Sequence, residues 1–159
     1  MRLISGARHQ AALHRFVLGN IDHCSGSFGL YTAFGVVDEA GKPVAGWIWH
    51  NYDRDAGVIE FSAASVRKNW LTRSILNALF AYAFDTAHCQ LVTTRNKASN
   101  RPLHRQLAAI GFDRIEVPRL FGRDDDGVLW TMSHEQWLES KFYMKGEGHG
   151  QIQFAATCA

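Results

Sequence analysis

The stretch from Val58 to Ala87 most constrains the fold, because its hydrophobic pattern changes period once, at a short basic segment. From Val58 to Val66, β-branched, aromatic and small residues predict a strand, on which Glu60 and Ser62 share one face. After Arg67-Lys68-Asn69, apolar residues recur at helical spacing. They are Trp70, Leu71, Ile75, Leu76, Leu79, Phe80, Ala83 and Phe84. The sequence therefore predicts a strand that enters a helix through a cationic turn.

Such a turn has the chemistry of an anion site. The first N–H groups of a helix lack intrahelical partners and carry the positive end of its dipole, which favours a phosphate. Arg67, Lys68 and Arg73 add full positive charges. A solvated charge run is the alternative. We expect the backbone N–H groups from Asn69 to Thr72 to bind a phosphate.

Two segments resemble motifs of the GNAT superfamily of acyl-CoA N-acyltransferases. Arg67-Lys68-Asn69-Trp70-Leu71-Thr72 resembles the motif R/Q-x-x-G-x-G/A, with Trp70 and Thr72 at the small-residue positions. An arginine followed by W-L-T-R is also similar to a branch of GNAT-like proteins often encoded by phages. The segment from Asn100 to Phe112 resembles N-x-x-S-x-x-x-Y-x-K-x-G-F, with Leu103 and Leu107 in place of Ser and Tyr. The family's tyrosine, often the general acid, has no counterpart here.

The resemblance covers Leu30 to Trp137 and implies a fold, a reaction and a site. The fold is α+β, with a central, mostly antiparallel twisted sheet and flanking helices. The reaction is transfer of an acetyl group from acetyl-CoA to an amine, with Glu60 as the general base. Alternatively, Glu60 is a sheet-surface carboxylate paired with a Lys or Arg. The residues expected to bind the cofactor are Val66, Arg67, Lys68, Asn69, Trp70, Leu71, Thr72, Arg73 and Asn100.

Apart from the resemblance, the order of the predicted elements, with a helix, a meander and then alternating strands and helices, favours an α+β domain. Ser5 is expected to cap a helix over 6–18 that Gly19 ends, and Asn100 and Gly111 are expected to bound a helix. Trp47 and Trp49 share a strand face and are expected in the core. The expected strands are 2–4, 30–38, 44–51, 58–66, 90–94, 112–117 and 128–132, with a loop over 118–127 and a short helix after Ser133.

Chain length and net charge narrow the expected domain organisation and the class of ligand. The 159 residues predict one domain over 1–143 and a Gly-rich tail over 144–159 that lies outside the core. A net charge of +2 does not indicate a nucleic-acid binder. A basic group near the second helix nevertheless leaves contact with a CoA phosphate or a polyanion open. Its members are Arg95, Lys97, Arg101, His104 and Arg105.

Cysteines and hydropathy point to a cytoplasmic protein. Cys24, Cys89 and Cys158 are widely spaced and, with the histidines, show no metal-ligand pattern, so we expect no metal. No run approaches the ~20 apolar residues of a membrane span.

Two alternatives to acetyl transfer remain open. They are modification of a nucleic-acid base, as in some phage proteins on this scaffold, and a non-catalytic protein that binds CoA or a partner. The acceptor and the oligomeric state are open as well.

Overall fold

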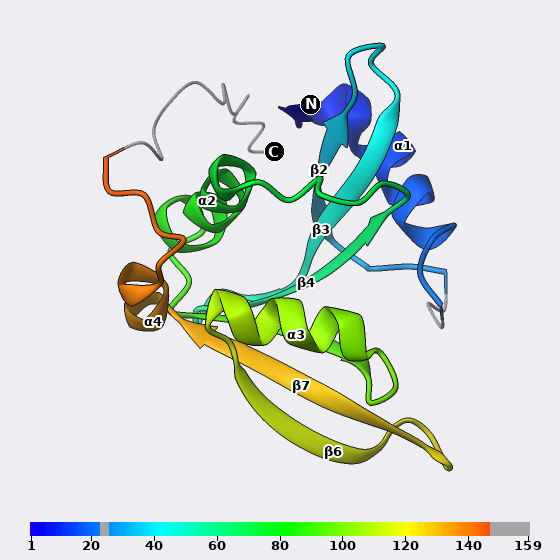
Figure 1. Ribbon diagram of the computed structural model, residues 1–159, viewed down its shortest axis with the longest axis vertical. Coiled ribbons are helices and arrows are strands. Elements are labelled where there is room, and N and C mark those ends of the chain that lie inside the picture. Colours follow the sequence, from blue (N-terminus) through cyan, green and yellow to red (C-terminus); the bar gives the residue numbers. More distant parts are fainter. Residues whose placement is uncertain (23–25, 147–159) are drawn as a thin grey trace.

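The computed structural model describes residues 1–22 and 26–146 of the chain (Figure 1). The strands are β1 (Arg2–Ile4), β2 (Tyr31–Val37), β3 (Pro43–Asp53), β4 (Val58–Ser65), β5 (Leu91–Lys97), β6 (Asp113–Gly122) and β7 (Asp125–Ser133). The helices are α1 (Ala7–Leu18), α2 (Arg73–Ala81), α3 (Arg101–Ile110) and α4 (His134–Glu139), and a π-helical segment η1 (Tyr82–Thr86) continues α2.

The described strands form one sheet in the order β1-β2-β3-β4-β5-β7-β6. Every neighbouring pair is antiparallel except β4 and β5, so the expected α+β fold with a mostly antiparallel sheet is confirmed. The parallel pair is short, because its register ends at Glu60 opposite Thr93. Figure 1 shows the chain crossing back from the end of β4 to α2, while the β6–β7 hairpin extends away from the other strands.

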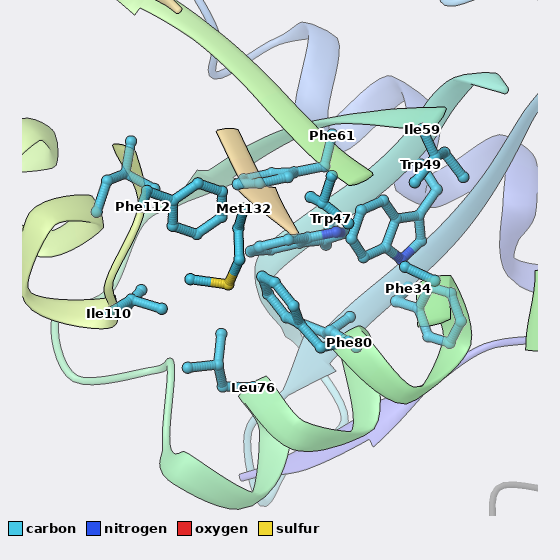
Figure 2. Close-up of a cluster of buried hydrophobic side chains, with 14 of the residues drawn as sticks. Phe34, Trp47, Trp49, Ile59, Phe61, Leu76, Phe80, Ile110, Phe112 and Met132 are labelled. Carbon is cyan, nitrogen blue, oxygen red and sulfur yellow. The ribbon is translucent and has the colours of Figure 1, made fainter. Parts of the chain in front are cut away.

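One face of the sheet carries the larger hydrophobic core, beneath α2, α3 and α4 (Figure 2). Trp47 and Trp49 are buried there, as expected, and Trp47 stacks on Phe61 with ring centroids 4.0 Å apart. Phe80 of α2 packs edge-on against both tryptophans. These aromatic rings are therefore core residues, which excludes Trp47 and Trp49 as an exposed stacking platform for bases.

The opposite face is covered by α1, which rests on two glycines. Leu13 and Val17 of α1 pack against Ile48 and other small or apolar residues of the sheet. Gly35 and Gly46 are paired across β2 and β3 directly beneath the helix. A Cβ at Gly46 would lie 2.5 Å from a methyl carbon of Val17, so the sheet can bring α1 this close only without a side chain there.

Two expected helix starts are wrong. The helix after the cationic turn begins at Arg73, because Asn69 has φ 58° and Thr72 is the extended N-cap, whose side chain accepts from the Ile75 N–H. Ser5 does not cap α1, since the N-cap is Gly6 and the Ser5 hydroxyl donates to the Ala33 carbonyl. The expected caps of α3 and α4, Asn100 and Ser133, are confirmed.

Three expected strands are too short. β5 continues through Arg95, Asn96 and Lys97, because these residues pair with β7. β6 and β7 extend into the expected loop over 118–127, so that only Arg123 and Asp124 form the turn. The longer β5 places Arg95 beside β4.

The segment after α4 contacts α2. The Asn77 side chain donates to the Phe142 carbonyl and accepts from the Met144 N–H. Most of the expected tail, 147–159, lies outside the described residues, as do His23, Cys24 and Cys158.

Candidate functional site

The site begins beyond Glu60 and Thr93, the last paired residues of β4 and β5. We call the opening between the two strands from that point onward the fork. The Val66 N–H donates to the Val44 carbonyl, so Val66 and Val44 are a hydrogen-bonded pair of the antiparallel β3–β4 ladder. This pair fixes which residues of β4 hydrogen-bond to β3, because such pairs alternate along the strands. In this phase the even-numbered residues of β4 pair with β3, and the N–H and C=O groups of Phe61, Ala63 and Ser65 face β5. Beyond Thr94, whose hydroxyl donates to the Phe61 carbonyl at 2.9 Å, β5 no longer follows β4. The fork therefore presents a row of backbone groups to an extended ligand.

The segment 66–72 joins this row to α2. Arg67, Lys68 and Asn69 are exposed, while Trp70 is half-buried and packs against the larger core. The Thr72 N–H donates to the Trp70 carbonyl, and the first intrahelical bond runs from Leu76 to Thr72. The N–H groups at the start of α2 are consequently those of Arg73 and Ser74, later in the chain than the sequence predicts.

The Arg73 guanidinium is partly engaged. Its Nε donates to the Phe142 carbonyl at 3.0 Å and its Nη2 to the Tyr143 carbonyl at 2.6 Å. Arg73 thus ties the segment after α4 to the first residue of α2. Arg73 follows Lys68 by five residues in the sequence, and these two carbonyls set the orientation of its guanidinium.

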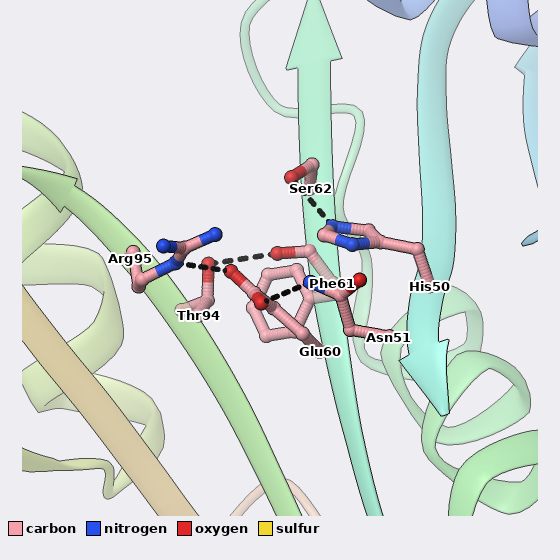
Figure 3. A network of polar contacts seen from close by, with 7 residues as sticks. All are labelled: His50, Asn51, Glu60, Phe61, Ser62, Thr94 and Arg95. Atoms are coloured by element: carbon pink, nitrogen blue, oxygen red, sulfur yellow. Dashed lines mark hydrogen bonds and ion pairs between the residues drawn. The ribbon is translucent and has the colours of Figure 1, made fainter. Parts of the chain in front are cut away.

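Glu60 lies at the base of the fork, where both of its carboxylate oxygens accept hydrogen bonds (Figure 3). Arg95 Nε donates to Oε1 at 2.7 Å, and Asn51 Nδ2 donates to Oε2 at 2.8 Å. The Glu60 side chain is 13% exposed and that of Arg95 is 47% exposed. Glu60 is thus paired with an arginine, and its role as general base stays a prediction.

Beside Glu60 lies a histidine that sequence reasoning missed. His50 is opposite Glu60 in the β3–β4 register and is 5% exposed. Its Nε2 lies 3.0 Å from the Ser62 hydroxyl, and the Phe28 ring lies 4.8 Å from the imidazole (Figure 3 draws the His50–Ser62 contact). Burial lowers the pKa of His50, against the opposing effect of the Glu60 charge. Counting outward from the turn over 54–57 would have set Asn51 opposite Glu60, because the register shifts between Asp53 and His50.

The basic residues expected near the second helix lie at three separate places in the structure. Arg95 pairs with Glu60, and Lys97 pairs with Asp125 at 2.7 Å. The other members, with Arg114, line a hollow of about 380 Å³ between α3 and β6. These hollow-lining side chains are Arg101, His104, Arg105 and Arg114. Asn100, expected at the cofactor, uses its side-chain oxygen to cap α3 through the Leu103 N–H.

Residues 1–22 and 26–146 contain no cluster of three or more His, Cys, Asp or Glu side chains placed to hold a metal ion. No helix in the same part of the chain is long and apolar enough to cross a membrane.

Comparisons with known proteins identify the fold. Neither a protein-family model nor a curated protein matches the sequence. The spermidine/spermine N-acetyltransferase of Vibrio cholerae matches with a TM-score of 0.70 over 87% of this chain and 95% of that one, at 14% identity. The ribosomal-protein-S5-alanine acetyltransferase of Vibrio fischeri matches with a TM-score of 0.59 at 19% identity, over 68% of this chain and 64% of that one. The chain thus spans about two thirds of the second enzyme. A probable acetyltransferase gives 0.59 at 17% identity. The chain has the fold of the GNAT acyltransferases.

Proposed function

We propose that the protein is an N-acyltransferase that moves an acetyl group from acetyl-CoA to an amine. The observation that carries this proposal is the fork, whose open β4 edge leads directly into a cationic turn and the N-terminus of α2. A ligand with amides at one end and phosphates at the other fits that order of groups. Acetyl-CoA has this composition, and the fold is shared with acetyltransferases.

In the proposed complex the backbone supplies most of the contacts. The N–H and C=O groups of Ala63 and Ser65 bind the amide chain, and the N–H groups at the start of α2 bind the pyrophosphate. The positive charges of Arg67 and Lys68 attract the pyrophosphate, and Trp70 holds the turn against the larger core. The remaining expected contacts, at Val66, Asn69, Leu71, Thr72, Arg73 and Asn100, belong to this same proposal.

The chemistry is mainly orientation. Bound acetyl-CoA supplies an acetyl thioester, and the site holds it beside the attacking amine. A backbone N–H that faces the fork stabilises the charge that develops on the thioester oxygen. The amine also loses a proton, and Glu60 is the carboxylate beside the point of attack.

Charge reversal tests the proposed phosphate site. We expect Arg67→Glu with Lys68→Glu to weaken acetyl-CoA binding at least 10-fold in calorimetric titration at low salt, because two acidic side chains repel the pyrophosphate. The matched control is Arg54→Glu with Arg123→Glu, which reverses two exposed charges in the β3–β4 and β6–β7 turns. Equal affinities of the two double variants would place the phosphates elsewhere. Failure of the wild type to bind acetyl-CoA would reject the proposed function.

The proposed acceptor is an amine of unspecified class. The structural neighbours' names include spermidine and a ribosomal-protein alanine, so polyamines and peptides that begin with alanine are the first acceptors to screen. We place the protein in the cytoplasm, where acetyl-CoA is present.

The arginine-lined hollow favours one second candidate, a modifying enzyme of nucleic acids related to the phage branch. In that case, DNA would bind with an affinity that falls steeply with salt. Binding of acetyl-CoA without acetylation of any acceptor would instead indicate a non-catalytic protein.

A further inference from the structure

Glu60 is poorly arranged to take a proton. Each of its oxygens already accepts a short hydrogen bond, from Arg95 and from Asn51. Each oxygen keeps a second lone pair, but a proton bound there would remove the negative charge that pairs with the Arg95 guanidinium. Fixed in this way, Glu60 contributes negative charge to the base of the fork.

Ser62 and His50 form an alternative route for the proton. Ser62 lies on the same face of β4 as Glu60, two residues further along the open part of the fork, and is half-buried. Its hydroxyl lies 3.0 Å from Nε2 of His50, which is buried behind it. A hydroxyl both donates and accepts, so it can receive a proton from the fork while passing its own to the imidazole.

We infer that Ser62 and His50 form a proton relay for the proposed acyl transfer, in which Ser62 contacts the attacking amine and His50 stores the proton. The relay rests on the proposed function. The amine nitrogen bonds to the thioester carbon and becomes positively charged. Its proton passes to Ser62 Oγ as the Ser62 proton passes to His50 Nε2. The carbon–sulfur bond then breaks, and the His50 proton returns through Ser62 to the thiolate, which leaves as the thiol.

The surroundings of His50 suit this role. Glu60 from β4 and Arg95 from β5 are the charged groups that act on it, and Tyr31 is its neighbour on β2. Tyr31 is in turn stacked on His14 of α1 at 4.6 Å. Burial has the largest effect and lowers the pKa of His50, while the Glu60 charge and an Asn51 hydrogen bond raise it. The imidazole is therefore neutral at pH 7, and Glu60 stabilises the imidazolium when it forms.

The relay predicts that kcat falls in variants that lack the His50 imidazole or the Ser62 hydroxyl. The assay measures release of the CoA thiol from acetyl-CoA with hydroxylamine, a small nucleophile that needs no specific acceptor pocket. We expect His50→Gln and Ser62→Ala to reduce kcat about 100-fold and to change acetyl-CoA affinity less than 2-fold. Ser62→Thr keeps the hydroxyl and should recover much of the rate. The matched control is His9→Gln, which alters a histidine near the start of α1 and should leave kcat near the wild-type value.

The pH profile separates His50 from Glu60 as the proton acceptor. In the wild type, kcat should rise with pH through the same midpoint that NMR titration gives for the His50 imidazole. Glu60→Gln removes the negative charge that raises the His50 pKa, so the rise should move to lower pH and persist. If Glu60 were the base, the same substitution would abolish the rise.

The results of these experiments distinguish a failure of the proposed function from a failure of the relay alone. A wild type that neither binds acetyl-CoA nor accelerates thiol release would overturn the proposed function and the relay with it. A wild type that does both, with His50→Gln and Ser62→Ala at full rate, would overturn the relay alone. The same holds if the kinetic midpoint differs from the His50 midpoint measured by NMR.

Discussion

Cys89 follows η1 and shows how burial changes the chemistry of one side chain. It is 3% exposed, and burial raises the pKa of its thiol from 9.0 to about 11. At neutral pH this change lowers the thiolate fraction by about 100-fold, and the thiolate is the reactive form. Cys89 is therefore a structural thiol of the larger core.

We expect iodoacetamide to leave Cys89 unmodified in the folded protein at pH 7.5, under conditions that modify it fully in urea. Peptide mass spectrometry after a fixed reaction time measures the modified fraction. The denatured sample is the control for intrinsic reactivity. Rapid modification of Cys89 in the folded protein would show that the end of η1 opens readily.

At the scale of elements, the contact between α1 and the sheet depends on small residues. Gly46 lies beneath Val17, and Gly35 lies beneath Leu13. We expect Gly46→Ala to reduce the free energy of unfolding by about 1–3 kcal/mol, because the added methyl group overpacks this contact. Urea unfolding measures the loss.

A control and a compensating change sharpen this test. Gly19→Ala adds the same methyl at an exposed helix end with φ −73°, and it should change stability by less than about 0.5 kcal/mol. Val17→Ala combined with Gly46→Ala makes room for the methyl, so the double variant should lose less than the sum of the single losses. Additive losses would mean that the two side chains do not collide.

At the scale of the whole molecule, buried histidines couple stability to pH. Burial lowers the pKa of both His50 and His104 from the ordinary 6.5. The unfolded chain therefore binds more protons than the folded one between these lowered values and 6.5. The free energy of unfolding is consequently highest above pH 6.5 and falls as the pH drops through that window.

Urea unfolding at intervals between pH 8 and pH 5 measures this decline. We expect His50→Gln and His104→Gln each to flatten the decline, since glutamine does not take up the proton. A wild-type stability independent of pH over this interval would contradict the prediction.

The sequence by itself determined the features that depend on near neighbours. The change from period two to helical period after Val66 located β4 and α2, and Asn100, Gly111 and Ser133 located the ends of two helices. These features are local because a hydrophobic stripe or a cap involves residues within one or two turns. The antiparallel meander followed from the turn residues between its strands, and the α+β class followed from the order of the elements.

Tertiary structure decided which residues meet. The length of β5 depends on β7, which pairs with Arg95 from more than thirty residues away and so brings it to Glu60. The contact of His50 with Ser62 depends on the β3–β4 register, where a shift of one residue would turn His50 to the other face of the sheet. Neither pairing leaves a periodic signal in the sequence, because hydrogen bonds between strands use backbone groups that every residue has. The candidate proton acceptors were therefore visible as residues, but only the folded sheet set Glu60 against an arginine and His50 against a serine.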